Sequence, residues 1–377
     1  MAWQILFWTS VALLAYTFAG YQLLIGLLAR VRRVRPTEAT LPAPARPAAI
    51  VAAYNEEERI AARIENLKAA TVPVEVIVCS DGSTDGTASA ARKAGARVFE
   101  FSERRGKAAC LSEVIPRLDA EIIVLADCRQ QFTPDTIPRL LSHFTDPEIG
   151  AVSGILRIGD PRTAAGAGVD LYWKMETVLR KAESDFDSCI GCTGAVYAIR
   201  RPLFQPLDAD IILDDVVIPM RIALAGRRVI YDTTAEAFDP QPLDPRAETV
   251  RKARTLAGNI QMCARFPAWL LPWKNRLAWQ LVSHKYLRLA GPLFLVGALA
   301  ASGCLAAIPF YRACLWVQLF LYLFAFAGLL APRLRLPLFS IPAGFLFLNF
   351  MTLRGFHRFF FGSRAGAWER AATQEPE

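Results

Sequence analysis

Acidic side chains follow three hydrophobic segments of the chain, at the points where buried strands are expected to end. The segments are Ile50–Ala53, Val74–Val78 and Ile122–Ala126, and the acids are Glu56, Asp81 and Asp127. If the segments are parallel strands, their carboxyl ends meet at one edge of a sheet, where folds of this kind bind ligands. The sequence therefore predicts a binding site at this edge that contains all three acids.

Helical patterns lie between these segments and must position the acids. They cover Glu56–Ala70, Thr84–Ala94 and Lys107–Leu118. Alternating strands and helices are typical of a parallel, doubly wound sheet with helices on both faces. The expected fold class is therefore α/β, with a Rossmann-like domain.

Four short motifs stand in order along this region. They are Ala53-Tyr54-Asn55-Glu56-Glu57, Ser80-Asp81-Gly82-Ser83-Thr84-Asp85-Gly86-Thr87, Gly106-Lys107-Ala108-Ala109 and Ala126-Asp127. Their order and spacing resemble those of the family 2 glycosyltransferases, over roughly residues 48 to 265. The resemblance implies a GT-A fold and a nucleotide-diphosphate sugar as the donor.

The resemblance also implies which residues bind the donor. In the resembling enzymes the aspartate at the position of Asp81 contacts the nucleotide base, and the Asn-Glu turn lies beside it. The implied nucleotide-binding residues are Ala53, Asn55, Glu56 and Asp81. Without the resemblance, the Asp81 segment would be predicted to form an Asx-turn and a helix cap. Lys107, at an expected helix start, is predicted to meet a donor phosphate, and a solvated lysine is the alternative.

A divalent metal ion is implied at Asp127. This residue takes the place of the first aspartate of the family's D-x-D motif, whereas Arg129 stands at the second position. A carboxylate there would hold Mg²⁺ or Mn²⁺ against the donor diphosphate. Two outcomes are open for Arg129: it faces a phosphate itself, or it weakens the metal site.

A second acidic site, Asp214-Asp215, precedes an apolar helical pattern that ends near Ala225. It resembles the family's acidic pair, and by that position Asp215 is the general base, with Asp214 beside it. Mutual repulsion or burial is expected to raise the pKa of the base. A pair that only caps the N-terminus of the helix is the alternative.

The segment Arg251-Lys252-Ala253-Arg254-Thr255 occupies the place of the family's Q-x-x-R-W motif. The resemblance implies that Arg254 binds the departing diphosphate, and Arg251 is predicted to bind the donor with it. Thr255 replaces the tryptophan that stacks on the acceptor sugar in processive synthases. Polymer synthesis and a single transfer to polyprenyl phosphate therefore both stay open.

The N-terminal residues Trp3–Ala29 are uncharged and long enough to cross a bilayer, which takes ~20 apolar residues. Four arginines follow within residues 30–35, and this bias predicts a cytoplasmic position for the next domain. A cleaved signal peptide is the alternative, but no basic residue precedes the apolar stretch. A Pro- and Ala-rich linker is expected over residues 36–47.

Three further apolar segments come late in the chain. They are Leu289–Ala307, Ala313–Ala331 and Leu336–Leu353. Two are expected to span the membrane, whereas Pro342 makes the third re-entrant or interfacial. The basic tail predicts that Trp368 and the C-terminus are cytoplasmic, with Phe359–Phe361 against the inner leaflet. Between catalytic region and apolar block, the Trp- and Lys/Arg-rich stretch Phe266–Tyr286 predicts a helix at the membrane surface, or an ordinary packing helix.

The net charge of +8 is explained by basic residues beside membrane segments and by donor phosphates, so no nucleic-acid partner is expected. Cys189 and Cys192 form a C-x-x-C without a second ligand pair for zinc, so buried or loop thiols are expected. The predicted divisions are 1–35 (anchor), 36–47 (linker), 48–265 (transferase), 266–286 (interfacial helix) and 287–377 (membrane region and tail).

These features predict an inverting, membrane-integrated family 2 glycosyltransferase. It would move a sugar, carried by UDP, to a glycan or lipid-linked acceptor at the cytoplasmic face of a bacterial inner membrane, in surface-polysaccharide synthesis. An inactive transferase-like scaffold is a further alternative, but the retained acids Asp81, Asp127, Asp214 and Asp215 argue against it.

Overall fold

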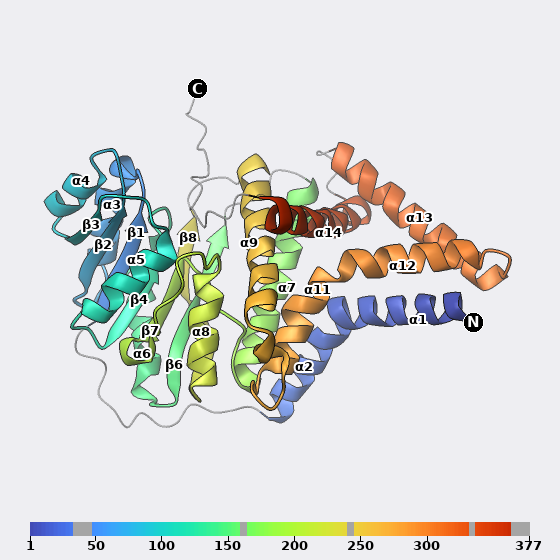
Figure 1. Cartoon of the computed structure of the whole chain (residues 1–377), viewed down its shortest axis with the longest axis horizontal. Helices are drawn as coiled ribbons and strands as arrows, with labels where there is room; N and C mark the ends of the chain where they lie inside the picture. The colour runs from blue at the N-terminus through green and yellow to red at the C-terminus, as the bar shows by residue number, and fades with distance from the viewer. Residues whose placement is uncertain (33–46, 159–163, 240–244, 332–335, 363–377) are drawn as a thin grey trace.

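The computed structural model describes residues 1–32, 47–158, 164–239, 245–331 and 336–362. An α/β domain lies at one end, apolar helices lie at the other, and two long helices stand between them (Figure 1). The two long helices are α7 (Ala164–Phe186) and α9 (Pro245–Arg265).

The α/β domain is built on one sheet, with the strand order β3-β2-β1-β4-β7-β6-β8-β5 among the described residues. The strands are β1 (Pro47–Ala53), β2 (Glu75–Asp81), β3 (Arg97–Phe101), β4 (Ile122–Ala126), β5 (Gln131–Phe132), β6 (Ile149–Ile158), β7 (Val196–Arg200) and β8 (Arg228–Asp239). The first four in chain order pair in parallel, as the alternating pattern predicts.

The prediction of a wholly parallel sheet is wrong at β7, which pairs antiparallel with both β4 and β6. Its register with β4 runs from Ile122↔Arg200 to Ala126↔Val196. The start of β7 therefore lies beside the end of β4, and the turn before β7 reaches the same edge as Asp127. One reversed strand thus adds a turn to the site that parallel strands alone would not supply.

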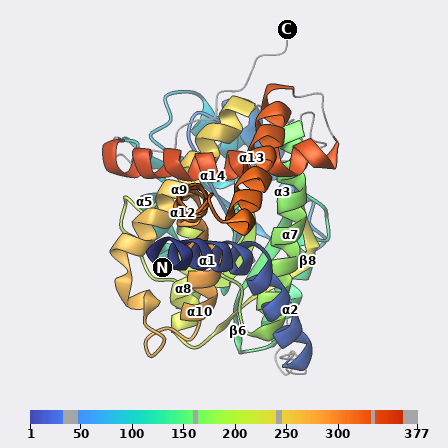
Figure 2. The ribbon, with the colours of Figure 1, turned by 90° about the vertical axis from the view of Figure 1, so that its right-hand side faces the viewer.

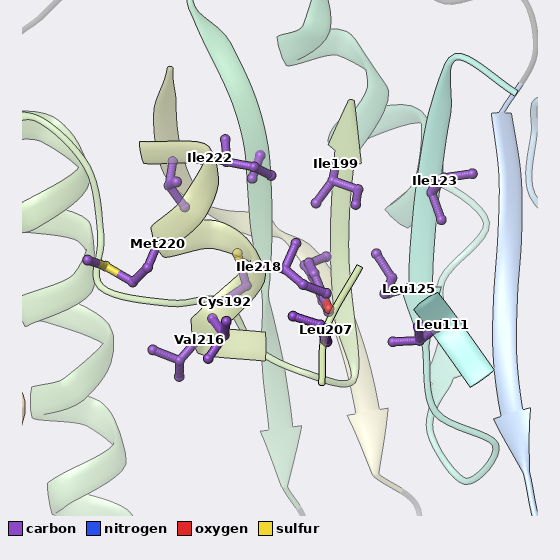
Figure 3. Packing of buried hydrophobic residues seen from close by; sticks show 14 of the residues in the cluster. Leu111, Ile123, Leu125, Cys192, Ile199, Leu207, Val216, Ile218, Met220 and Ile222 are labelled. Carbon is purple, nitrogen blue, oxygen red and sulfur yellow. The ribbon is translucent and has the colours of Figure 1, made fainter. Parts of the chain in front are cut away.

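Helices cover both faces of the sheet because its central strands are apolar on both sides. The shorter helices of this domain are α3 (Glu57–Lys68), α4 (Thr87–Lys93), α5 (Lys107–Val114), α6 (Thr136–Ser142) and α8 (Asp214–Leu224). Neighbouring residues of β1 enter different cores: Ile50 packs in the cluster that contains α5 and α8, and Val51 packs in the cluster with α3 and α6. Figure 3 shows Ile218 of α8 in the same core cluster as Ile199 of β7 and Leu125 of β4. This packing holds α8, and the two acids at its start, against the sheet.

The N-terminal apolar segment forms one helical stretch, Ala2–Val31, long and apolar enough to cross a membrane. It consists of α1 (Ala2–Ala15), a π-helical turn (Tyr16–Gly20) and α2 (Tyr21–Val31). Two C-terminal helices pass the same test, α13 (Pro309–Leu330) and α14 (Pro337–Phe361). The stretch Ala278–Leu289 and α12 (Gly291–Cys304) would make one further span only as a pair bent by 59°.

Pro342 lies inside α14 without ending the helix, and the re-entrant or interfacial position predicted for this segment stays a prediction. The direction of the helix is unusual all the same. Figure 1 shows α1 and α12 lengthwise and α14 foreshortened, whereas in Figure 2 α14 is seen lengthwise and α1 is foreshortened. Helix α14 therefore crosses the direction of α1 and α12, and it packs on α7 and α9.

The single helix predicted for Phe266–Tyr286 is wrong. The segment contains a 3₁₀ turn (Pro267–Leu270), α10 (Ala278–Leu281) and a π-helical turn (Val282–Tyr286), followed by α11 (Leu287–Leu289). Buried Asn275 interrupts it, because its side chain donates to Trp269 O over 2.7 Å and accepts from Leu277 N over 2.9 Å. Such local side-chain bonds compete with a continuous helix.

Candidate active site

The turns after β1 and β2 are fastened to each other by hydrogen bonds. Thr84 N donates to Asn55 Oδ1 over 2.8 Å, and Asn55 has a φ of +54°, a left-handed conformation that asparagine tolerates. Glu56 N donates to Thr87 Oγ1 over 2.8 Å, and Ala53 is buried at the end of β1. The structure thus brings the first two motifs together at the carboxyl edge of the sheet, as the sequence predicts.

Asp81 is buried and engaged with the backbone of a neighbouring loop. Its two carboxylate oxygens accept N–H bonds from Arg105 (2.7 Å) and Gly106 (2.8 Å), and 1% of the residue is exposed. The aspartate therefore positions the loop that leads into Lys107. Direct contact with a nucleotide base, which the resemblance implies for Asp81, stays a prediction.

Sequence analysis missed Arg104, which lies beside these turns. Its guanidinium carbon is 4.0 Å from the centre of the Tyr54 ring, and its Nε and one terminal nitrogen are buried without a hydrogen-bond partner in the described part of the chain. A Cβ on Gly82 would lie 2.4 Å from Arg104 N, so only glycine allows this close approach. The motif used in the sequence comparison begins two residues later in the chain, at Gly106, and therefore does not include Arg104.

Lys107 connects the two acidic positions that the sequence predicts. Its Nζ lies 2.9 Å from Asp127 Oδ1 and 3.5 Å from Asp214 Oδ2. Burial disfavours its charge, but Asp127 and Asp214 outweigh burial and raise the pKa of Lys107 above its ordinary value. The alternative of a solvated lysine is therefore wrong.

Asp215 occupies a space that a glycine leaves open. A Cβ on Gly194, in the turn before β7, would lie 2.8 Å from Asp215 Oδ2. The backbone is fixed there too, because Cys192 N donates to Asp215 O over 2.7 Å. Burial and then the charge of Asp214 raise the pKa of Asp215 to about 6, whereas Lys107 acts in the opposite direction. The acidic pair lies in the first turn of α8, where carboxylates interact favourably with the helix dipole, as the capping alternative predicts. The function of Asp215 as general base stays a prediction.

A pocket of about 580 Å³ joins these groups. Its lining includes Lys107, Asp127, Asp214, Asp215, Arg254, Thr255, Arg358, Phe359 and Phe360. The wall opposite the sheet is therefore α9 together with the end of the apolar helix α14. Helix α9 also packs on the loop before the acidic pair, since a Cβ on Gly258 would lie 2.6 Å from Leu213 Cγ.

The three arginines predicted near the donor differ in where they lie relative to the pocket. Arg254 lines the pocket, whereas Arg251, one turn earlier in α9, is not among the described residues that line it. Its predicted donor contact stays untested. Arg129 pairs with buried Asp239 at 2.8 Å, and both outcomes named for it, contact with a phosphate or a weaker metal site, stay open.

The residues present fit a metal ion held through one carboxylate rather than a protein cage. Among the described residues, no group of three or more His, Cys, Asp and Glu side chains is placed to hold a metal. Asp127 lines the pocket, and a hard cation there can complete its shell with phosphate oxygens and water. Cys189 and Cys192 are buried, and Cys189 Sγ donates to Gly191 O over 3.3 Å, so this pair consists of buried thiols, as expected.

The fold is that of the GT-A glycosyltransferases, with apolar helices attached. Residues 48–208 match the family model described as Glycosyl transferase family 2. This part of the chain is a domain of that family, as the motifs predict.

Known proteins of two kinds are similar to the chain. Poly-beta-1,6-N-acetyl-D-glucosamine synthase from Staphylococcus aureus (strain COL) is 26% identical over 261 residues, which are 63% of this chain and 54% of the synthase. N-acetylglucosaminyltransferase from Azorhizobium caulinodans is 30% identical over 146 residues, 37% of each protein. The chain thus spans about half the length of the curated synthases it matches.

One solved structure is similar along almost its whole length. The mannosyltransferase PcManGT from Pyrobaculum calidifontis, solved in complex with GDP-Man and Mn²⁺, has a TM-score of 0.72 and 26% sequence identity. The similarity covers 94% of this chain and 99% of that one. It therefore includes apolar helices as well as the α/β domain.

Proposed function

We propose that the chain is an inverting glycosyltransferase that moves a sugar from a UDP-sugar to an acceptor presented at the membrane. One observation carries this proposal. A single pocket is lined by Lys107 and Arg254, which suit a diphosphate, and by Asp215, which suits a proton acceptor.

In this function each group has a separate task. Lys107 and Arg254 offset the charge that develops on the departing diphosphate. Asp215, whose pKa is raised to about 6, is ionised at neutral pH and takes the proton of the acceptor hydroxyl as it attacks. One in-line displacement on an α-linked donor gives a β-product.

A divalent ion, Mg²⁺ or Mn²⁺, would be held by Asp127 and by the donor diphosphate, and it would neutralise phosphate charge. Mn²⁺ is present in the similar mannosyltransferase structure. The ammonium group of Lys107 already lies 2.9 Å from Asp127 Oδ1, so the ion and Lys107 would share this carboxylate.

The nucleotide is proposed to lie against the turns after β1 and β2. The stacked pair of Arg104 and Tyr54 lies close to Asn55 and Asp81, and the unpaired Arg104 nitrogens offer hydrogen-bond donors. Ala53, Glu56 and Arg251 stay in the proposed donor site from the family resemblance alone.

The acceptor is proposed to arrive from the membrane along α14. Arg358, Phe359 and Phe360 line the pocket, so the end of α14 lies at the catalytic face. The direction of α14 suits a helix that lies along the inner surface of the membrane (Figures 1 and 2). The catalytic domain and the C-terminus would then both be cytoplasmic, in a bacterial inner membrane.

Two acceptor classes fit, and one observation favours each. The curated relatives are named as an N-acetylglucosamine polymer synthase and an N-acetylglucosaminyltransferase, which favours a glycan acceptor in surface-polysaccharide synthesis. The second candidate is a single transfer to a lipid-linked acceptor such as polyprenyl phosphate. Thr255 in the pocket wall, where the resembling processive synthases have tryptophan, favours it.

A donor panel tests the proposal directly. Purified protein in nanodiscs is incubated with UDP-GlcNAc, UDP-glucose or GDP-mannose, with and without Mn²⁺, and released nucleotide diphosphate is measured. Release with one UDP-sugar is expected. Release only with GDP-mannose would move the assignment to the other base, and no release with any sugar would refute the proposal.

The position of the C-terminus has its own test. In a variant without native thiols, Gln374→Cys is expected to resist a membrane-impermeant maleimide in intact cells and to react after permeabilisation. Labelling of intact cells would show that α14 crosses the membrane.

A further inference from the structure

A group of buried charged side chains lies between the apolar helices and the α/β domain, away from the pocket lining. Its members are Glu176, Arg180 and Glu183 of α7 together with His284, Lys285 and Arg288 of the segment that leads into α12. We define these six residues as the α7 charge cluster. The predicted catalytic motifs do not include any of them.

His284 stands at the centre of the cluster and is fully buried. Its Nε2 lies 2.8 Å from Glu176 Oε1, and its Nδ1 lies 3.0 Å from Glu183 Oε1. Each ring nitrogen of His284 therefore faces a glutamate carboxylate, and the imidazole bridges Glu176 and Glu183. Such a bridge fixes the two glutamates of α7 relative to each other.

Glu183 connects the cluster to the N-terminal apolar helix. The hydroxyl of Tyr21 donates to Glu183 Oε1 over 2.7 Å, and both residues are buried. The ring of Tyr21 also packs edge-on against Trp279, with centroids 5.3 Å apart. The cluster therefore joins α2, α7 and the segment before α12, which come from three distant parts of the chain.

Arg180 connects the cluster to the catalytic edge. Its Nε lies 3.2 Å from Glu176 Oε1, and its Nη1 donates to Thr193 Oγ1 over 3.3 Å. Thr193 is held a second time, because its N–H donates to Ser153 Oγ over 2.8 Å. The next residue is Gly194, against which the carboxylate of Asp215 rests.

The charges that face Arg180 keep it in place. Burial disfavours its guanidinium, but Glu176 together with Tyr231 and Cys189 outweighs burial and raises the pKa of Arg180 above its ordinary value. The Tyr231 ring centre lies 6.0 Å from its guanidinium carbon on the other side. Burial disfavours the charge of Glu176, but His284, Lys285 and Arg288 together outweigh burial and lower the pKa of Glu176 well below the usual range.

We propose that Arg180 is a positioning residue for the transfer reaction, which sets the place of Asp215 through Thr193 and Gly194. Glu176 pairs with Arg180, and His284 in turn bonds Glu176. The apolar helices must therefore pack correctly on α7 to keep Arg180, and with it Asp215, in position. The inference rests on the proposed function, in which Asp215 is the base. It assigns to α7 a part in catalysis that the family motifs do not contain.

Arg180→Met tests this, with Arg180→Lys as the conservative variant and Arg200→Met as the matched control. Arg200 is also an internal arginine of the domain, but it donates to the carbonyls of Ile149, Phe144 and Asp146, away from the pocket. For each variant in nanodiscs, kcat, donor Kd and the thermal midpoint are measured.

Arg180→Met is expected to lower kcat about ten- to a hundredfold, the scale of a catalytic group misplaced by ~1 Å, with donor Kd unchanged. Arg180→Lys is expected to recover part of that loss. Arg200→Met is expected to lower the thermal midpoint while the folded fraction keeps its kcat. Equal kcat losses for the two methionine variants, in proportion to unfolding, would overturn the positioning function.

A double-mutant cycle extends the test to His284. If His284 acts through Arg180, the loss of kcat in His284→Gln with Arg180→Lys is smaller than the product of the two single losses. Independent, multiplicative losses would overturn the connection. If wild-type protein releases no nucleotide diphosphate from any donor, the proposed function fails. If wild-type protein releases nucleotide diphosphate and Arg180→Met has the same kcat, only the present inference fails.

Discussion

The turns proposed to bind the donor and the pocket wall proposed to receive the acceptor, here called the donor side and the acceptor side, are built in different ways. On the donor side, neighbouring motifs bond to one another: Asn55 with Thr84, and Asp81 with the backbone of Gly106. On the acceptor side, Asp215 depends on the turn before β7, on α9 and on the end of α14. The donor side is thus a local construction, whereas the acceptor side needs segments from the whole chain and from the apolar helices.

This difference has a consequence for substitution. A change on the donor side should affect the affinity for the nucleotide sugar and little else. A change on the acceptor side should leave donor affinity intact and alter turnover, because what it disturbs is the position of a reacting group.

Asp215→Asn should produce the largest effect. The amide keeps the shape of the side chain but cannot take a proton, so turnover should fall at least ~10²-fold, the usual scale of general base catalysis. Donor Kd, measured by calorimetry, should change little. Asp208→Asn is the control, because Asp208 pairs with Arg265 near the same loop. Retained turnover in Asp215→Asn would remove this residue as the base.

Asp127→Ala should act on the donor side. Loss of the carboxylate would remove the ligand of the proposed ion and leave buried Lys107 with one partner fewer, so donor Kd should rise by about tenfold, equivalent to ~1.4 kcal/mol. EDTA should have the same effect on wild-type protein as Asp127→Ala, because both remove the proposed ion from the donor site. Full turnover in EDTA would mean that Lys107 and Arg254 neutralise the diphosphate without metal.

The donor side is also the side that the sequence predicted well. Strands β1, β2 and β4 and the turns after them follow from runs of apolar residues and from turn residues, both of which are local signals. The edge strand β3 was missed because charged Arg97 and Glu100 interrupt its pattern, and Arg104 was missed because no motif contains it. Lys107 lies at the predicted helix start and is largely buried between Asp127 and Asp214, whereas its contact with a donor phosphate stays a prediction.

The acceptor side shows what local patterns cannot give. The antiparallel direction of β7 brings Gly194 to Asp215, but the sequence of residues 191–200 does not indicate whether this strand pairs parallel or antiparallel. The break at Asn275 and the path of α14 across α7 and α9 depend on contacts between distant segments. The buried charge cluster was missed for the same reason, because its six residues are ordinary helix-surface residues until the helices pack.

The pH profile separates the two sides further. Because the pKa of Asp215 is raised to about 6, the base is protonated and inactive below that pH. Turnover at saturating donor should therefore rise with pH and level off above about 7, while donor Kd stays constant over the same range. The comparison uses kcat and Kd between pH 5 and 8. A flat kcat profile across pH 6 would mean that another group takes the proton.

The smallest expected effect comes from the contact between α14 and α9. A Cβ on Gly355 would lie 2.7 Å from Leu256 Cβ and 3.2 Å from Ala257 N, so the two helices touch at this glycine. Leu256 is two residues from Arg254 in the pocket wall, and Phe359 of α14 lies one turn beyond Gly355. Gly355→Ala should therefore push α14 away from α9 and shift the acceptor wall of the pocket.

Overpacking of this kind costs about 1–3 kcal/mol, of which a part will appear in turnover, so a fall in turnover of about fivefold is expected. Arg254, a proposed contact of the diphosphate, lies near the change, so donor Kd should rise, but by less than turnover falls. Gly303→Ala in α12 is the matched control, because a Cβ there meets nothing within 4 Å. If Gly355→Ala weakens donor binding as much as it lowers turnover, the end of α14 belongs to the donor side, and the division between the two sides of the pocket would have to be redrawn.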